Sequence, residues 1–266
     1  MCGRYVATED ADGLLKMFVV DERDPRAKDS RSHWDGAPNY NVAPTDSVPA
    51  IVLHEGHRVL TSFRWGLVPF WAKDAKIGAR MINARSETIE EKSAFAQSFE
   101  RRRCLLPADG FYEWQKASGK KLPWFVRRTD GRPMVFAGIW ASWRPKDEPD
   151  TDRLLTCAIL TTDANQVLAP IHDRMPVVIE EADFDLWLDP QADEADLKRL
   201  LRPSPDAAVE RFRVSTRANS VANNDPSLLE PVDEANDEDI VGPGHPAITP
   251  STHDIDAAEQ PSLFSD

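Results

Sequence analysis

Strand-like runs dominate the middle of the chain. They cover residues 48–53, 58–65, 104–106, 110–115, 122–127, 133–140, 154–161 and 175–179. Asp130-Gly131, between two of these runs, is a dipeptide typical of a hairpin turn. Several runs follow one another through short turns with no helix between them. The pattern therefore predicts a mainly antiparallel α+β domain built on a curved sheet or partial barrel.

Helical patterns are few and lie between the strand-like runs. The first has Thr8 as its N-cap and ends near Val20. The others cover residues 93–101, 163–168, 181–188 and 194–201. Residues 21–38 are polar and have no clear period, which predicts a surface loop. No internal repeat is visible, so we expect a single domain over residues 1–232 with a few flanking helices.

The composition changes after Val232. Residues 233–266 contain nine acidic residues and no Lys or Arg. Their apolar content is too small to offset the entropy of ordering the chain, so we expect a disordered acidic tail. Gln260, Leu263 and Phe264 near its end resemble the short peptide by which bacterial repair proteins bind the replicative sliding clamp. A chance match of so short a pattern is the alternative.

The formal net charge of the whole chain is −13, which by itself disfavours a nucleic-acid partner. Without the tail, 36 acidic residues stand against 32 basic ones, a net charge of −4. A nearly neutral domain can still present a basic groove, although each basic residue fits a solvated surface equally well. The candidates for such a groove are Arg4, Arg64, Lys73, Lys76, Arg80, Arg85, Arg101, Arg102, Arg103 and Arg174.

The cysteines and the hydropathy exclude several classes of protein. No stretch approaches the ~20 apolar residues of a membrane span, and the N-terminus lacks the order of a signal peptide, so we expect a cytoplasmic protein with no membrane partner. Cys2, Cys104 and Cys157 are too few and too far apart for a disulfide framework. Cys104 and Cys157 lie in apolar runs and are expected to be inert. No cluster has the spacing of metal ligands, and we expect no cofactor.

Cys2 is the most unusual residue of the sequence. Removal of Met1 would leave Cys2 with a free α-amine beside its thiol. An aldehyde condenses with such an amine to an imine, and the thiol then closes a thiazolidine ring, helped by the proximity of the two nucleophiles. The open-chain form of an abasic deoxyribose offers such an aldehyde. Taken alone, Cys2 fits better as a residue that merely follows the start codon.

Polar residues also interrupt apolar runs further along the chain. A buried charge is costly unless it is paired or functional, so Glu113 between Tyr112 and Trp114 points to chemistry. Strand alternation could equally aim Glu113 at solvent. His172 lies beside a strand-like apolar run, although a lone histidine is more often structural. The segments concerned are NYNVAPT with Asn41, MINARSET with Asn83, DGFYEWQ with Glu113 and PIHDRMPVVI with His172.

Nine blocks of sequence together resemble the SRAP family, the SOS-response-associated peptidases or abasic-site processing proteins. The blocks are MCGRY, NYNVAPT, RWGLVPFWAKD, INARSET, LLPADGFYEW, AGIW, TTDAN, IHDRMPV and VANNDPSLLEPV. The resemblance implies a sensor of abasic sites in single-stranded DNA that forms a covalent thiazolidine crosslink and shields the site during replication. It implies that Cys2 is the linking nucleophile, that Asn83 holds the N-terminal residue and the sugar, that Glu113 is the acid/base and that His172 acts on the sugar.

The resemblance also implies how DNA is bound. Phe70 and Trp71 match an aromatic wedge that stacks on a base and favours a single strand or a single-to-double-strand junction. Ala72 stands where a second aromatic residue would follow, so we expect a weaker wedge. The matches to phosphate-contacting or site-lining positions are Arg4, Asn41, Arg85, Ser86 and Arg174. Two other classes stay open: an N-terminal-nucleophile or cysteine peptidase, which could remove its own Met1, and a non-covalent single-strand binding module.

Overall fold

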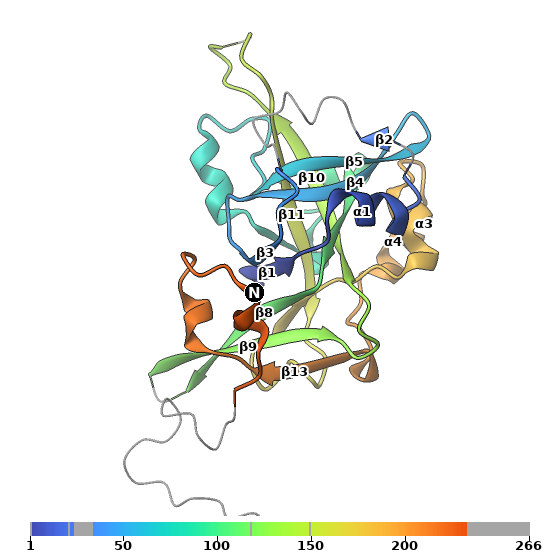
Figure 1. Ribbon diagram of the computed structural model, residues 1–266. Helices are drawn as coiled ribbons and strands as arrows, with labels where there is room; N and C mark the ends of the chain where they lie inside the picture. Colours follow the sequence, from blue (N-terminus) through green and yellow to red (C-terminus); the bar gives the residue numbers. More distant parts are fainter. Residues whose placement is uncertain (1, 21, 24–33, 118, 149, 233–266) are drawn as a thin grey trace, which may run out of the picture. The chain divides into compact units, whose positions relative to one another are not determined.

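The computed structural model describes residues 2–20, 22–23, 34–117, 119–148 and 150–232 (Figure 1). The strands are β1 Arg4–Ala7, β2 Glu22–Arg23, β3 Asn39–Val42, β4 Ser47–His54, β5 His57–Trp65, β6 Asn83–Arg85, β7 Arg103–Ala108, β8 Gly110–Ala117, β9 Lys120–Arg128, β10 Met134–Trp143, β11 Leu154–Asp163, β12 Arg174–Pro176 and β13 Val209–Arg213. The α-helices are α1 Ala11–Met17, α2 Ala96–Arg101, α3 Phe184–Leu188 and α4 Glu194–Leu200, and short 3-10 helices include η2 Ala75–Arg80.

Five strands close into a barrel. The order β11-β10-β7-β4-β5 is antiparallel at every step, and β5 then pairs in parallel with β11. Closure leaves these strands without a free edge. β12, β6 and β2 pair with the strands of this barrel. The predicted α+β class with a mainly antiparallel, curved sheet is confirmed, and the barrel is closed where the sequence predicted a curved sheet or partial barrel.

A second sheet is antiparallel throughout and has the order β13-β9-β8-β1-β3. It packs on the barrel through aromatic side chains. The ring of Tyr5 on β1 lies 5.2 Å from that of Trp65 and 5.8 Å from that of Phe136, in edge-to-face geometry. Phe111 on β8 also packs edge-on against Phe136, at 6.1 Å. These contacts fix β1 and β8, and so Cys2, against the barrel.

Successive residues of the barrel strands enter two different hydrophobic clusters, as expected for side chains that alternate along a strand. The first cluster includes Leu14, Phe99 and Trp187 of the helices. The second includes Tyr5 and Phe111 of the other sheet. The helices and the second sheet therefore both cover the barrel strands. No helix among the described residues is long and apolar enough to span a membrane.

Alkaline pH should destabilise this fold. Cys104 and Cys157 are fully buried, as predicted, and burial raises the pKa of both thiols and of the Tyr5 and Tyr112 hydroxyls. In the unfolded chain these groups lose protons above about pH 8.5 for Cys and pH 10 for Tyr. Their contribution to stability is complete below those values and is lost as the pH rises. We expect the urea midpoint of unfolding to fall steeply above about pH 9; a constant midpoint up to strongly alkaline pH would contradict this.

Two predicted helices differ in the structure. Helix α1 is capped by Asp10, whose side chain accepts a hydrogen bond from the Gly13 N–H, 2.8 Å away. Thr8 instead donates from its N–H and its hydroxyl to Asp109, so the prediction of Thr8 as the cap was wrong. No helix forms over residues 163–168, all of which the structure describes. There the side chain of Asn165 accepts from the Leu168 N–H and stabilises a turn instead.

The predicted hairpin at Asp130-Gly131 was also wrong. The turn itself forms, with Gly131 at a positive φ of 72°. However, β9 pairs with β8 and β13, whereas β10 pairs with β7 and β11. Both strands therefore have their edges occupied, and the turn carries the chain from one sheet to the other.

Arg103 was a candidate for a basic groove, and this was wrong as well. It is 4% exposed. Its guanidinium donates to the backbone carbonyls of Phe99, Glu100, Trp187 and Asp189. Arg103 therefore joins the ends of α2 and α3 and cannot bind a ligand at the surface.

Candidate active site

Cys2 is fully buried just before β1, and Asn83 holds its backbone. The Asn83 side-chain amide donates to the Cys2 carbonyl oxygen over 2.8 Å. Asn83 begins β6, which pairs with β11 at Ile159, so the barrel fixes the position of the amide. The Asn83 Oδ1 atom is buried and accepts no hydrogen bond from the described residues. That oxygen can accept a hydrogen bond from a ligand.

Glu113 lies close enough to Cys2 for its negative charge to affect the pKa of the Cys2 thiol. Glu113 is 2% exposed, so the alternative in which it points to solvent was wrong. Its strand is next to β1, since Arg4 is opposite Tyr112. Burial raises the pKa of the Cys2 thiol well above its ordinary value, and the negative charge of Glu113 raises it further. Burial therefore favours the protonated thiol, which needs a base before it can react.

Arg4 follows two residues after Cys2 and is held on three sides. Its Nη1 donates to Asn41 Oδ1 at 2.7 Å and to the Ala218 carbonyl at 3.3 Å. Its guanidinium lies 5.6 Å from the centre of the Trp114 ring. Burial lowers the pKa of Arg4, although nearby Asp46 opposes this effect. Arg4 is thus fixed beside Cys2 and stays cationic.

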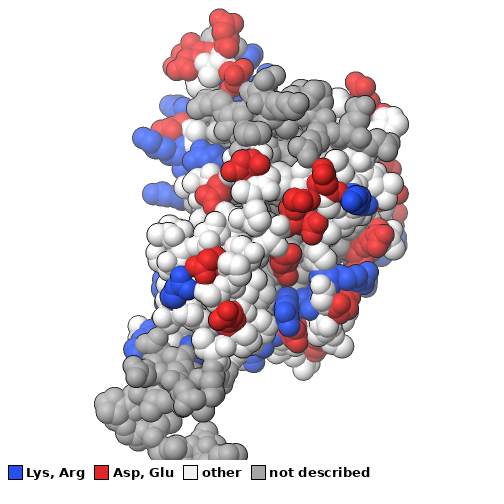
Figure 2. All heavy atoms as spheres, in the orientation of Figure 1, with Lys and Arg blue, Asp and Glu red and all other residues white. Residues whose placement is uncertain are grey.

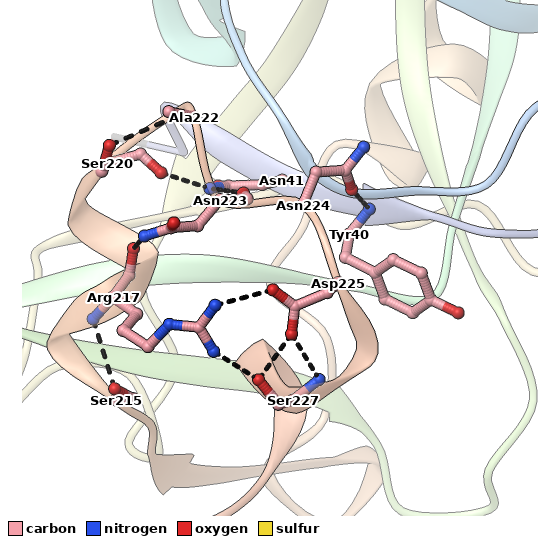
Figure 3. Close-up of polar contacts among 10 residues, drawn as sticks. All are labelled: Tyr40, Asn41, Ser215, Arg217, Ser220, Ala222, Asn223, Asn224, Asp225 and Ser227. Carbon is pink, nitrogen blue, oxygen red and sulfur yellow. Dashed lines mark hydrogen bonds and ion pairs between the residues drawn. The ribbon is translucent and has the colours of Figure 1, made fainter.

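Residues 215–225, which we call the strap, are tied to this region by asparagines (Figure 3). The Asn41 amide donates to the carbonyls of Ser220 and Asn223 at 2.9 and 2.8 Å. The side chain of Asn224 accepts from the Tyr40 N–H. Asn219 accepts from the indole N–H of Trp114 over 2.6 Å. The strap thereby supports both Arg4 and Trp114, and all the polar atoms of the buried Asn41 side chain have partners within the protein.

His172 can carry its proton on either ring nitrogen. Its Nδ1 lies 3.0 Å from the backbone nitrogen of Arg174 and 2.8 Å from Asp173 Oδ1. With the proton on Nε2, the Nδ1 atom accepts from the Arg174 N–H; when Nδ1 is protonated, it donates to Asp173. The loop that carries His172 contacts β8, because Gln115 donates to the Pro170 carbonyl at 3.4 Å. His172 is therefore held near the strand that carries Glu113.

Arg174 is bound by two carboxylates. Its guanidinium makes a two-pronged pair with Glu87, at 2.9 and 2.8 Å, and contacts Asp163 Oδ1 at 2.6 Å. It also donates to the Thr161 carbonyl. Although burial acts to raise it, the pKa of Glu87 is lowered overall by its hydrogen bonds to Arg174. A phosphate that binds Arg174 must compete with these carboxylates.

Comparison with known proteins identifies the family of this chain. The chain matches the family model described as SOS response associated peptidase (SRAP) over residues 1–221. It belongs to the SRAP family. Abasic site processing protein YoqW of Bacillus subtilis is 38% identical, over 86% of this chain and 99% of that protein. Abasic site processing protein HMCES of Gallus gallus is 31% identical, over 88% and 78% of the two chains.

Solved structures share this SRAP fold. A protein from Bacteroides thetaiotaomicron has a TM-score of 0.75 and 24% identity, covering 87% of this chain and all of that one. A phage-related protein from Bordetella bronchiseptica has a TM-score of 0.59 and 28% identity, over 80% and 94% of the two chains. The first likeness shows the fold alone.

Several predicted SRAP site residues are joined by contacts or by strand pairing, and others lie apart. Arg85, opposite Thr161, and Arg174, opposite Asp163, both lie beside the end of β11, and Ser86 follows Arg85 directly. Phe70 and Trp71 are 61% and 41% exposed in the turn after β5. Within the described part of the chain, no hydrogen bond joins either aromatic residue to Cys2 or Asn83. Gln260, Leu263 and Phe264 lie outside the described residues.

Sequence reasoning on this SRAP chain missed three contributors. Trp114 binds both Arg4 and Asn219, and its place beside Glu113 was a signal that could have been used. Asp173 contacts His172 and is its neighbour in IHDRMPV. Asp163 also binds Arg174, from its place opposite Arg174 on the paired strand β11, and the sequence did not indicate that pairing.

Proposed function

We propose that this SRAP protein captures abasic sites in single-stranded DNA through a covalent bond to Cys2, and so shields them during replication. The observation that carries the proposal is the placement of Cys2, whose carbonyl is held by Asn83 at 2.8 Å, with buried Glu113 on the strand next to β1. The names of YoqW and HMCES, both abasic site processing proteins, support the same substrate.

The proposed reaction begins with removal of Met1, which frees the α-amine of Cys2. The amine adds to the aldehyde carbon of the open sugar, and loss of water gives an imine. The thiol then adds to the imine carbon and its proton is transferred to the nitrogen, which closes the thiazolidine ring. Glu113 takes the thiol proton and delivers it, a role that the raised pKa of the Cys2 thiol makes necessary.

The surrounding residues bind the rest of the strand in this proposal. Arg4, Arg85, Ser86 and Arg174 contact phosphates, which positions the strand but reads no sequence. His172 donates to or accepts from the sugar as the aldehyde is exposed. Asn41 contributes by holding the strap and Arg4. Exposed Phe70 and Trp71 stack on bases at a single strand or a junction.

The test is a denaturing gel of the protein mixed with a single-stranded oligonucleotide that carries one abasic site. We expect a shifted band with the wild type, and none with Cys2→Ala or with an undamaged strand. A shifted band that persists in Cys2→Ala would overturn the proposal. Absence of a band with the wild type, after removal of Met1 is verified, would favour a peptidase or a non-covalent binding module.

Side reactions follow from the same intermediate. An imine permits β-elimination at the abasic site, and ring closure by the thiol competes with it. Cys2→Ala retains the α-amine, so this variant should cleave more of the strand than the wild type does. Removal of Met1 by the protein itself remains part of the proposal, because Cys2 and Glu113 could serve amide hydrolysis.

Glu87→Gln should strengthen DNA binding if Arg174 contacts phosphate. The change removes one negative charge from the guanidinium, while Asp163 and the Thr161 carbonyl still orient it. We expect undamaged single strands to bind about fivefold more tightly, or ~1 kcal/mol. Fluorescence anisotropy in a Cys2→Ala background measures this, with Glu210→Gln as the control. Unchanged or weaker binding would leave Arg174 with a structural role.

The tail carries a separate proposal, a contact with the sliding clamp that would bring the protein to replication forks. Leu263 and Phe264 would fill an apolar pocket and Gln260 would bond at its rim. Leu263→Ala with Phe264→Ala should abolish clamp binding in a pull-down and leave abasic-site capture unchanged. Equal clamp binding by this variant would contradict the assignment.

A further inference from the structure

A cavity of about 450 Å³ opens at the surface of the barrel, apart from the residues assigned so far around Cys2. Its lining comes from four segments: the turn after β5, helix α2 and its end, β10, and the start of β11. The lining residues are Phe70, Gln97, Arg102, Trp140, Ser142 and Arg153. The volume falls within the range of sites that hold small organic ligands.

The lining combines flat side chains with positive charge. Trp140 is half-buried and stacks on Phe63, with ring centroids 5.5 Å apart and an interplanar angle of 17°. The guanidinium of Arg102 lies 5.5 Å from the Trp140 ring centre. Phe70 presents a ring that is 61% exposed. Nucleic-acid bases stack on aromatic rings and on guanidinium planes of this kind.

The charge of the cavity fits a phosphate. Its lining residues include Arg102 and Arg153 and no acidic residue. Arg153 is exposed, and its Nη1 lies 3.4 Å from the Ser142 hydroxyl. In Figure 2, Lys and Arg side chains gather over the segment between β5 and β7, which Figure 1 colours cyan to green. The exposed basic residues of that segment include Lys73, Lys76, Arg80 and Arg101.

The cavity lies within reach of a strand held at Cys2. Arg153 precedes β11, and Asn83, which binds Cys2, is opposite Ile159 on the same strand. Six residues of extended chain span roughly 20 Å. An extended single strand of a few nucleotides can span this distance.

We propose that this cavity is a second DNA subsite, which takes one unpaired nucleotide of the captured strand a few positions from the abasic site. The base stacks against Phe70 and the Arg102–Trp140 pair, and its phosphate binds Arg153. The inference rests on the proposed function for the identity of the strand. The subsite binds the DNA that flanks the abasic site. It therefore raises the affinity for single-stranded DNA and sets the flank length beyond which affinity stops rising. It takes no part in forming the bond to Cys2.

The experiment uses Phe70→Ser, Arg153→Gln and the double variant, all at exposed positions. Capture is measured with abasic oligonucleotides whose flanks are lengthened on the 5′ or the 3′ side from two to about eight nucleotides, which spans the predicted distance. In the wild type, lengthening one of the two flanks should raise the rate at low DNA concentration by about tenfold. The double variant should lose this gain from longer flanks. Val19→Ser and Arg199→Gln, at exposed positions elsewhere, are the matched controls.

A second measurement separates this proposal from that on Cys2. Anisotropy of an undamaged single strand needs no chemistry, and there the double variant should bind about tenfold more weakly than the wild type. Arg153→Gln alone should reduce the salt slope by about 0.7, as expected for one lost phosphate contact. Equal affinity and an equal gain from longer flanks would overturn the subsite, whether or not Cys2 forms a crosslink.

Discussion

Glu113→Gln should slow covalent capture of an abasic strand by about 100-fold or more, the range expected for loss of a positioned acid/base. Glutamine keeps the size and most hydrogen-bonding capacity of the side chain but cannot accept the thiol proton. The effect should be large because burial alone favours the protonated Cys2 thiol, which then needs a base that the variant lacks. The rate of adduct formation at saturating DNA, followed on denaturing gels, measures the effect.

Two variants make this result specific to Glu113. Glu113→Asp should recover part of the rate, because a carboxylate is restored one methylene away. Glu210→Gln removes a partly exposed carboxylate of β13 that pairs with Arg127, and should leave the rate unchanged. If Glu113→Gln reacts as fast as the wild type while remaining folded, the role as acid/base is wrong.

Arg103→Met should have the largest effect on stability. The substitution removes the donor from two buried backbone carbonyls, those of Phe99 and Trp187, and from the part-buried carbonyls of Glu100 and Asp189. An unsatisfied buried polar group costs about 1–3 kcal/mol, so two of them predict a loss of about 2–6 kcal/mol or failure to fold. Urea unfolding measures it.

Arg101→Met is the matched control, since Arg101 is two residues away and its side chain is 73% exposed. We expect its stability to lie within about 0.5 kcal/mol of the wild type. If both variants lose the same free energy of unfolding, the hydrogen bonds from Arg103 to the carbonyls make no specific contribution to stability.

The sequence predicted the fold class because consecutive strand-like runs joined by short turns favour antiparallel pairing. The closure of the barrel could not be predicted from the sequence. The closing contact pairs Arg64 in parallel with Thr156, residues that are far apart in the chain. The hairpin prediction at Asp130-Gly131 failed for a related reason. The residues of a turn do not show that β9 and β10 each pair with other strands on both edges.

The site was predicted in part. Family motifs pointed to Cys2, Asn83 and Glu113; the structure joins Cys2 to Asn83 by a hydrogen bond and buries Glu113 on the strand next to β1. The run Arg101, Arg102 and Arg103 shows the limit of residue type alone: one is exposed, one lines a cavity and one is buried. Those differences depend on where α2 ends and β7 begins, and a run of three arginines does not encode that.

Mass spectrometry of the DNA adduct tests the central claim most directly. The protein is incubated with an abasic oligonucleotide, digested, and the modified peptide is sequenced. The account predicts a single linked residue, Cys2, in a chain that lacks Met1, with the mass of peptide plus DNA less one molecule of water. Linkage to any other residue, or to a chain that retains Met1, would contradict it.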